Sequence, residues 1–335
     1  MGTPRWVIAM GASAGGVEAL REFFAAIPAD IDAAFLVVVH IPAHSQSHLH
    51  DVLAHGTQLQ VSAACDQEQL KAGHVYVAQA DLHLTVEGDR IRLTRGPKEC
   101  RVRPAIDVLL RSVAVSYGPR AVGIVLSGML DDGTAGLWAI KDQNGIALVQ
   151  DPGEAMYPSM PESAISHVRV DLAAPVAALA QHVAQIAAGP GDDRVRGAGS
   201  PLHRTETEIA NEGNALKLGV MSMGQVSGYT CPDCHGVLVQ IEEGPIVRFR
   251  CHTGHAFSLL TLLAEVSEAI DKGLWDTIRS LEERVLLLRQ LGALSDQAGR
   301  GKEGREYLRC ADETETRIKP VRELVLDEQL FGRQR

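Results

Sequence analysis

Continuous apolar runs separated by helix-length segments mark the first half of the chain. The runs 6–12, 34–39, 121–126 and 147–150 are dominated by β-branched and small apolar residues, without a polar residue at every second position. Runs of this kind are typical of strands that are buried on both faces of a sheet. Because helical segments follow them after short loops, the pattern predicts an α/β domain with a doubly wound, largely parallel, Rossmann-like sheet.

Two other stretches of this region have a different pattern. Residues 73–78 and 82–93 alternate apolar and polar positions around a turn at Gly88 and Asp89, which is typical of antiparallel hairpins. Residues 164–188 are apolar at helical spacing, and we expect them to form a closing helical segment.

The chain changes character after residue 188. Residues 189–215 are rich in glycine and charge and poor in apolar residues, so we expect a flexible linker. A small zinc-ribbon-like module over residues 216–262 follows. Apolar residues then recur three and four positions apart within residues 263–330, which is typical of a helical hairpin whose apolar stripe forms an internal seam or, as the alternative, packs against a partner. We therefore expect the domain of residues 1–188 to fold without the rest of the chain.

Length and charge narrow the possible functions. The 335 residues exceed the usual size of one hydrophobic core, in agreement with more than one domain. The 32 Lys and Arg residues against 42 Asp and Glu give a net charge of −10, which argues against nucleic acid as a partner and disfavours a zinc-ribbon regulator of DNA. No apolar stretch approaches the ~20 residues of a membrane span, and no signal peptide is evident, so we expect no membrane insertion and a cytoplasmic location.

The turn after the first run contains the sequence Gly-Ala-Ser-Ala-Gly-Gly at residues 11–16. A dinucleotide-binding turn would need glycine at position 13, where the pyrophosphate approaches the backbone, so Ser13 argues against it. Two interpretations remain. One is a G-x-S-x-G nucleophile turn whose backbone N–H groups face an anionic intermediate, and the other is a glycine-rich turn whose serine only caps the helix.

Other residue types found in catalytic sites also follow predicted strands. His40 comes directly after the second apolar run, and Asp131 and Asp132 lie in the turn after the third. Because the carboxyl ends of parallel strands meet at one edge of a sheet, we expect Ser13, His40 and one of the aspartates to converge. The set favours a hydrolase in which Ser13 attacks an acyl carbon, His40 transfers the proton and the aspartate orients the imidazole.

Two arginines and a cysteine cluster add further candidates. Arg101 and Arg103 precede a helix and are candidates for holding an acidic substrate, or else belong to a solvated loop. Three of the six cysteines cluster with histidine at the spacing of zinc knuckles, which predicts one structural zinc ion bound by Cys231, Cys234, Cys251 and His255. His252 is the alternative fourth ligand. We favour His255 because the segment from Cys251, with Gly254 in it, reproduces the first knuckle more nearly.

Four motifs, in this order, resemble those of the CheB-type protein-glutamate methylesterases of bacterial chemotaxis. They are residues 11–16, the His-Ile-Pro of residues 40–42, the Arg-Pro-Ala-Ile-Asp of residues 103–107 and the Gly-Met-Leu-Asp-Asp-Gly of residues 128–133. The resemblance covers about residues 5–179. In that family the serine of the first motif, the histidine of the second and the second acid of the fourth form the catalytic triad. The resemblance therefore implies Ser13, His40 and Asp132.

The resemblance also implies an activity. Family members hydrolyse γ-glutamyl methyl esters on the cytoplasmic helices of chemoreceptors, releasing methanol, and many also deamidate receptor glutamines. Such catalysis needs no cofactor. Met129 matches a methionine of the family's substrate pocket, and Ala14 would offer its N–H to the oxyanion hole, although Ala14 and Ala105 stand where the family often has hydroxyl side chains.

One departure from the family concerns regulation. Typical members carry a phosphorylated receiver domain before the esterase. The 335 residues include no counterpart to that domain, so we expect the esterase to be regulated in a different way. The alternative to an enzyme is a signalling scaffold that binds receptor tails, or related signalling proteins, through an esterase-like domain.

Overall fold

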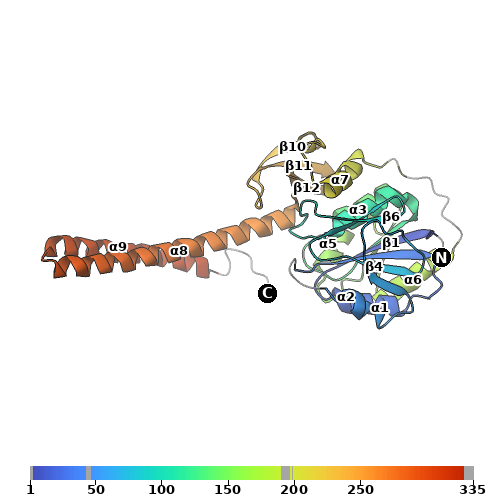
Figure 1. The fold of residues 1–335 in the computed structure, drawn as a ribbon, viewed down its shortest axis with the longest axis horizontal. Coiled ribbons are helices and arrows are strands. Elements are labelled where there is room, and N and C mark those ends of the chain that lie inside the picture. Colours follow the sequence, from blue (N-terminus) through green and yellow to red (C-terminus); the bar gives the residue numbers. More distant parts are fainter. Residues whose placement is uncertain (1–2, 43–46, 190–196, 198, 328–335) are drawn as a thin grey trace. The chain divides into compact units, whose positions relative to one another are not determined.

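The computed structural model describes residues 3–42, 47–189, 197 and 199–327. The chain divides into two compact units, residues 1–261 and residues 262–335 (Figure 1).

The centre of the first unit is a seven-stranded parallel sheet with the order β3-β4-β2-β1-β7-β8-β9. Its strands are β1 (Trp6–Ala12), β2 (Ala33–Val39), β3 (Gln60–Ala63), β4 (His74–Val77), β7 (Ala121–Val125), β8 (Ile146–Gln150) and β9 (Leu172–Ala174). The strand order reverses at β1, which pairs with β2 on one side and with β7 on the other. The carboxyl ends of these three strands therefore lie side by side at the switch point.

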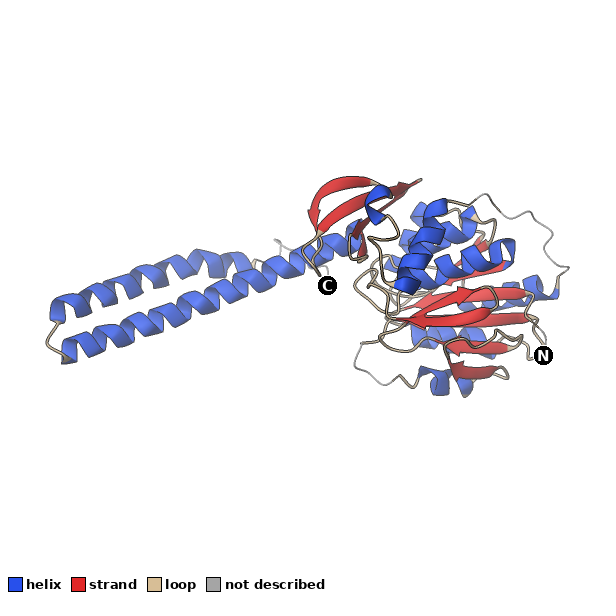
Figure 2. Cartoon of the chain, turned by 45° about the horizontal axis from the view of Figure 1, so that its top comes forward, coloured by secondary structure: helices blue, strands red, loops and turns tan. Residues whose placement is uncertain are grey.

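Helices cover both faces of this sheet (Figures 1 and 2). One layer consists of α1 (Gly16–Ala25), α2 (Leu49–Ala54) and α6 (Val176–Ala188), and the other of α3 (Ile106–Tyr117), α4 (Thr134–Asp142) and α5 (Ser159–His167), with a 3₁₀ turn at Gly118–Arg120. Every residue of β1 and β2 is buried, which explains why these strands appear as continuous apolar runs. The predicted doubly wound α/β fold is confirmed.

One local prediction that was wrong concerns the antiparallel hairpin. Residues 74–77 do not belong to the hairpin but form β4, a parallel strand between β2 and β3. Its alternating polar positions are tolerated because His74 stacks on Tyr76 and hydrogen-bonds Ser62 of the short β3. The antiparallel hairpin itself consists of β5 (His83–Glu87) and β6 (Arg90–Thr94).

The predicted helical segment of residues 164–188 is interrupted. The helix α5 ends at His167, β9 follows, and α6 begins only after Pro175. A proline cannot lie in the interior of a helix without breaking a hydrogen bond, so Pro175 marks a helix start and not a continuation.

The predicted linker of residues 189–215 contains a helix. The helix α7 (Pro201–Glu212) is capped by Ser200, whose hydroxyl accepts from the N–H of Leu202. It packs against α3 and the β5–β6 hairpin, and its His203, Glu206 and Ile209 are buried. Part of the expected linker is therefore built into the first unit.

The module after α7 is a small antiparallel sheet in the order β10-β11-β12-β13. A 3₁₀ turn at Val220–Ser222 precedes it, and the strands are β10 (Gln225–Thr230), β11 (Val237–Glu243), β12 (Ile246–Cys251) and β13 (Ala256–Ser258). The strand β13 also bonds to the loop that precedes α3, since Cys100 N–H donates to Ala256 O at 2.9 Å and Ala256 N–H donates to Lys98 O at 3.1 Å. The module therefore belongs to the same unit as the parallel sheet.

A buried ionic cluster joins α7 and the module to α3. It consists of three acids and three arginines, Glu99, Glu206, Glu243, Arg111, Arg248 and Arg250. Glu99 accepts from Arg111 at 2.9 Å and from Arg250 at 2.6 Å. Burial opposes the ionisation of Glu99, but the two guanidinium groups outweigh it and lower the pKa of Glu99 to about 2. Charges of equal number are thus paired away from water, as buried charges must be.

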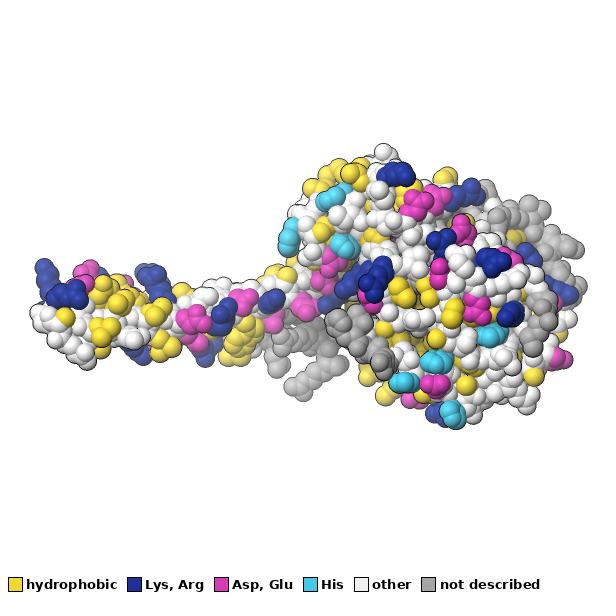
Figure 3. Space-filling view, viewed as in Figure 1, with side chains coloured by type: hydrophobic (Ala, Val, Ile, Leu, Met, Phe, Trp, Pro, Cys, Tyr) yellow, Lys and Arg dark blue, Asp and Glu magenta, His cyan; other side chains and the backbone are white. Residues whose placement is uncertain are grey.

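The second unit is a helical hairpin made by α8 (Leu259–Gln297), which starts in the first unit, and α9 (Gly301–Leu326). Its seam is formed by Leu274, Ile278, Leu281, Val285, Leu288, Ala311, Ile318, Val321 and Val325, which confirms the predicted internal seam. Figure 3 shows further hydrophobic side chains on the outside of the hairpin, and Leu287, Leu291 and Leu294 are among the exposed residues. Among the described residues, no helix has the length and apolar character needed to cross a membrane.

Candidate active site and metal cluster

Ser13 lies in the turn between β1 and α1. Its N–H donates to Ser127 O at 2.9 Å, and its carbonyl accepts from Gly16 N at 3.0 Å. Gly15 has a φ of +73°, and a Cβ at this position would lie 2.8 Å from Met156 Cβ, so the turn requires glycine there. The turn holds Ser13 half-buried at the carboxyl edge of the sheet.

His40 directly follows β2 and faces Ser13. Its ring Nδ1 lies 3.1 Å from Ser13 Oγ, and its Nε2 lies 2.8 Å from Asp132 Oδ2. Because an ionised carboxylate only accepts hydrogen bonds, Nε2 carries the proton and Nδ1 accepts from the Ser13 hydroxyl. Chymotrypsin-type proteases use the two ring nitrogens the other way round. Ser13 and His40, expected at this edge from their strand-end positions, and Asp132, the aspartate that the resemblance implies, thus form one hydrogen-bonded row.

Asp132 is buried in the loop between β7 and α4, and the first turn of α3 holds its carboxylate. Ile106 N–H donates to Oδ2 at 2.8 Å, and Asp107 N–H donates to Oδ1 at 2.9 Å. The positive end of the α3 dipole favours a carboxylate at this place. Both oxygens of Asp132 are therefore fixed relative to the ring of His40.

The neighbouring acid, Asp131, has a different partner. Its Oδ1 accepts from Ser258 Oγ at 2.7 Å, at the end of β13. Burial raises the pKa of Asp131 to about 6, although the hydrogen bond from Ser258 opposes the shift. Of the two aspartates that the turn offers, Asp132 is the one that hydrogen-bonds His40.

Asp107 is a buried acid that the sequence reasoning did not single out as a site residue. Its Oδ1 accepts from Gly133 N at 2.9 Å and from Gly136 N at 2.6 Å. Burial raises the pKa of Asp107 well above its ordinary range, and the neighbouring Asp132 raises it further. Asp107 ties the start of α4 to the start of α3 and so steadies the loop between β7 and α4. Its sequence signals are its place in the first turn of the helix after Pro104 and at the end of the Arg-Pro-Ala-Ile-Asp motif.

Ala14 and Met129 were predicted to border the substrate. The Ala14 N–H has no acceptor among the described residues, while its carbonyl accepts from Ser127 Oγ at 2.8 Å. That bond fixes the peptide next to Ser13 at the start of α1, where a free N–H can donate to an oxyanion. Met129 is 58% exposed in the loop after β7. Its side chain can therefore contact a bound substrate.

Arg103 was predicted as a candidate for holding an acidic substrate, and its guanidinium is engaged within the fold. Its Nε and Nη2 both donate to Asp81 Oδ1, at 3.0 and 2.6 Å, and its Nη1 donates to Gly96 O at 2.7 Å. These bonds hold together the loops that precede α3. They give Arg103 a part in the architecture of the site.

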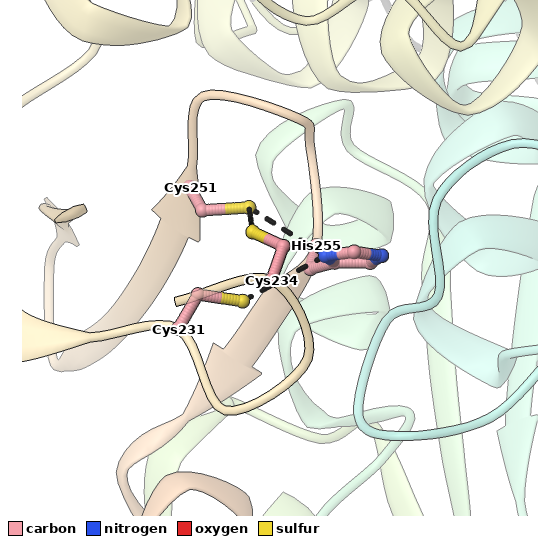
Figure 4. Close-up of side chains that lie close together, drawn as sticks. All are labelled: Cys231, Cys234, Cys251 and His255. Atoms are coloured by element: carbon pink, nitrogen blue, oxygen red, sulfur yellow. Dashed lines mark hydrogen bonds between the residues drawn. The ribbon is translucent and has the colours of Figure 1, made fainter. Parts of the chain in front are cut away.

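The four predicted zinc ligands lie together in the module (Figure 4). One ligand atom from each of Cys231, Cys234, Cys251 and His255 falls within 4.8 Å of every other. Cys234 Sγ lies 3.6 Å from Cys251 Sγ, and His255 Nδ1 lies 3.7 Å from both Cys231 Sγ and Cys251 Sγ. His252, the alternative ligand, is exposed and its ring lies beside Gly236.

Comparison with known proteins adds independent evidence for the parallel-sheet region. Residues 8–183 match the model of the CheB methylesterase family. Among the solved structures, one that is similar is the crystal structure of the Thermotoga maritima CheB methylesterase catalytic domain, with a TM-score of 0.52 and 28% identity, covering 54% of this chain and 98% of that chain. The matched residues end within α6, before α7 and the module.

Curated relatives agree with this match. A protein-glutamate methylesterase/protein-glutamine glutaminase of Methanosarcina mazei is 35% identical over 190 residues, which cover 54% of this chain and 52% of that protein. A protein of the same description from Xanthomonas euvesicatoria is 40% identical over 162 residues, covering 47% of this chain and 45% of that protein. A putative counterpart from Leptospira interrogans is 34% identical over 165 residues, covering 49% and 86%. The chain spans about half the length of the first two of these relatives.

Proposed function

Because the chain belongs to the CheB methylesterase family, we propose that it is a serine esterase that hydrolyses γ-methyl esters of protein glutamate residues and releases methanol. The observation that carries this proposal is the row from Ser13 Oγ through His40 to Asp132, with contacts of 3.1 and 2.8 Å. It lies inside the region that matches the family, at the edge of the sheet where ligands bind in doubly wound folds.

The geometry supports acyl transfer through Ser13. The Ser13 hydroxyl gives its proton to His40 Nδ1 as Oγ attacks the ester carbonyl, and Asp132 stabilises the imidazolium through Nε2–H. The Ala14 N–H donates to the oxyanion of the tetrahedral intermediate. His40 then protonates the departing methoxide, and the same residue activates the water that releases glutamate from Ser13. With ammonia as the leaving group, the same steps deamidate a glutamine.

The partners of such an enzyme are methylated chemoreceptor cytoplasmic helices or related signalling proteins. The relatives are named for both the methylesterase and the glutaminase activity, which supports glutamate esters and glutamines on a protein as substrates. We place the reaction in the cytoplasm, where the signalling helices of receptors lie.

Release of labelled methanol from a receptor fragment that carries labelled glutamate methyl esters tests the proposal. Ser13→Ala and His40→Ala should each lower the rate by about 10⁴-fold or more, because nucleophile and base act as one unit. The chain offers a matched control, since Ser62 Oγ and His74 Nε2 form a second Ser–His pair at 2.8 Å. Ser62→Ala should keep the activity. Near-native turnover by Ser13→Ala, or binding of the fragment without methanol release, would contradict an esterase.

We also propose that the module holds one structural zinc ion through Cys231, Cys234, Cys251 and His255. Zinc–sulfur bonds of ~2.3 Å in a tetrahedron separate neighbouring sulfurs by about 3.8 Å, and the sulfurs of Cys234 and Cys251 are 3.6 Å apart. A bound ion would cross-link the turn after β10 to the ends of the β12–β13 hairpin. A sheet of this size has little core of its own, so such a cross-link would stabilise it.

Metal analysis of the purified protein tests the zinc site. We expect one zinc ion per chain in the wild type and loss of that zinc in Cys234→Ser and His255→Ala. Cys65→Ser is the control, because Cys65 is an exposed cysteine outside the cluster, and His252→Ala should also keep the metal. Retention of zinc by His255→Ala together with its loss in His252→Ala would reassign the fourth ligand.

A further inference from the structure

The hydroxyl of Ser258 connects the module to the loop that carries the proposed catalytic aspartate. Ser258 Oγ donates to Asp131 Oδ1 at 2.7 Å across 127 positions of sequence. Asp131 directly precedes Asp132, whose carboxylate hydrogen-bonds His40 at 2.8 Å. One hydrogen bond and one peptide unit therefore separate the last residue of β13 from the proposed triad.

Ser258 is held rigidly in this place by its own neighbours. It is the N-cap of α8, where its Oγ accepts from Thr261 N at 3.0 Å and its N–H donates to Thr261 Oγ1 at 2.8 Å. This reciprocal pair has the form of a capping box. With the hydroxyl oxygen occupied as acceptor by the helix, its proton is directed at Asp131. The start of α8 also favours the negative charge of that carboxylate.

The strand β13, which ends in Ser258, is also hydrogen-bonded to the segment that leads into α3, the helix whose first turn holds Asp132. Through Ala256, β13 pairs with residues 98–100 by hydrogen bonds of 2.9 and 3.1 Å, and Glu99 in that segment is bound to Arg111 of α3 and Arg250 of β12. The first two N–H groups of α3, those of Ile106 and Asp107, donate to Asp132. The module thus contacts both the loop that carries Asp132, through Asp131, and the segment of residues 98–100 that leads into α3.

We propose that Ser258 is a positioning residue for the esterase reaction. By holding Asp131, it keeps Asp132 aligned with His40. The module, which lies outside the region that matches the family, thereby sets the activity of Ser13. This inference rests on the proposed function. Asp132 and His40 are the groups that act in the reaction, and Ser258 acts through them. Such a role for Ser258 places control of the esterase activity in a segment that follows the esterase domain in the sequence.

Ser258→Ala removes the hydroxyl and should lower kcat for methanol release by about tenfold, the effect of losing one hydrogen bond to a charged group. KM should stay unchanged, because the bond orients the catalytic groups and does not touch the substrate. Ser258→Thr keeps a hydroxyl and should restore most of the rate. Ser227→Ala is the matched control in the same module, since Ser227 Oγ donates to the backbone at Leu238 O, and it should keep the wild-type kcat.

A double-mutant cycle shows whether the two side chains act through one contact. Asp131→Ala removes the acceptor and should also cost about tenfold, and the Ser258→Ala/Asp131→Ala double variant should be no slower than the slower single variant. Multiplied losses in the double variant would overturn the proposal. So would a wild-type kcat in Ser258→Ala, an effect confined to KM, or an equal loss in Ser227→Ala.

A second measurement distinguishes a failure of this positioning role from a failure of the proposed substrate. The rate at which an organophosphonate modifies Ser13, followed by mass spectrometry, reports activation of the serine without any glutamate ester. A wild type that reacts with the probe but releases no methanol would contradict the substrate, and a slower reaction in Ser258→Ala would still support positioning. A probe reaction that does not depend on Ser258 would overturn the inference.

Discussion

The parallel sheet and the module are held in the same unit by opposite kinds of contact. The sheet is joined to its helices by apolar side chains, as in the edge-to-face packing of Phe23 and Phe24 against Phe35. The module and α7 are joined to α3 largely by buried charges, with Arg250 between Glu99 and Glu206, beside a small apolar cluster of Ala105, Val108 and Ala210. An apolar contact forms wherever shape permits, whereas a buried ion pair is stable only with every partner in place. The first region therefore tolerates single changes that the second should not.

The largest effect that we expect is a loss of kcat, caused by a substitution at the carboxyl edge of the sheet that leaves the packing of the sheet intact. Asp132→Asn should lower kcat by about 10⁴-fold, because an amide cannot hold His40 in the tautomer that accepts the Ser13 proton. Asp131→Asn should cost at most about tenfold, because its amide oxygen can still accept the hydrogen bond from Ser258. Methanol release with folding followed by circular dichroism measures both. Equal losses in the two variants would mean that the third member of the row is misassigned.

The positions of the proposed catalytic residues could be predicted from sequence, but their supports could not. Ser13, His40 and Asp132 each follow an apolar run, and parallel strands bring such positions to one edge. The contact between Asp131 and Ser258 has no such signal, because it joins two common residue types from elements far apart in sequence. Asp107 was missed for a similar reason, since its two backbone donors are visible only in the folded structure.

The error over the linker has the same physical origin as the contrast between the two regions. The helix α7 is polar in composition because Glu206 and His203 are buried among charges and not in apolar contacts. A rule that equates polar composition with exposure fails for such a segment. A chain ending at Ala188 would also leave Arg111 without Glu206, 3.4 Å from its Nε, so we no longer expect residues 1–188 to fold as well alone as in the whole chain.

The next largest effect should come from the ionic cluster. Glu206→Gln removes the carboxylate that three arginines share and should lower the free energy of unfolding of the first unit by about 3–5 kcal/mol, because it leaves buried positive charge unpaired. Glu208→Gln is the control on the same helix, since Glu208 is exposed, and it should change the stability by less than about 0.5 kcal/mol. Urea denaturation of both variants checks this.

The pH dependence of the same variant sharpens this prediction. Burial opposes ionisation of Glu206, but Arg111, Arg248 and Arg250 lower its pKa well below the ordinary 4.5. A carboxylate with a lowered pKa in the folded state stabilises above its unfolded pKa and loses this contribution as the pH falls. The stability difference between wild type and Glu206→Gln should therefore be full at pH 7 and shrink as the pH falls below about 4.5. A constant difference would show that Glu206 acts through packing and not through its charge.

The smallest effect belongs to the hairpin seam of the second unit, which is apolar like the sheet but only two helices thick. Ile318→Val removes one methylene group from the seam and should lower the local stability of α8 and α9 by about 0.5–1.5 kcal/mol. Amide hydrogen exchange in these helices measures this, and Ile270→Val, at a position that is 47% exposed, is the control that should change little. Methanol release should be unaffected, because the residues of the proposed active site and of the module belong to the first unit. A loss of turnover in Ile318→Val, with the first unit still folded, would show that an apolar seam in the second unit also contributes to catalysis. In that case the kind of contact, apolar or ionic, would no longer explain which regions tolerate single substitutions.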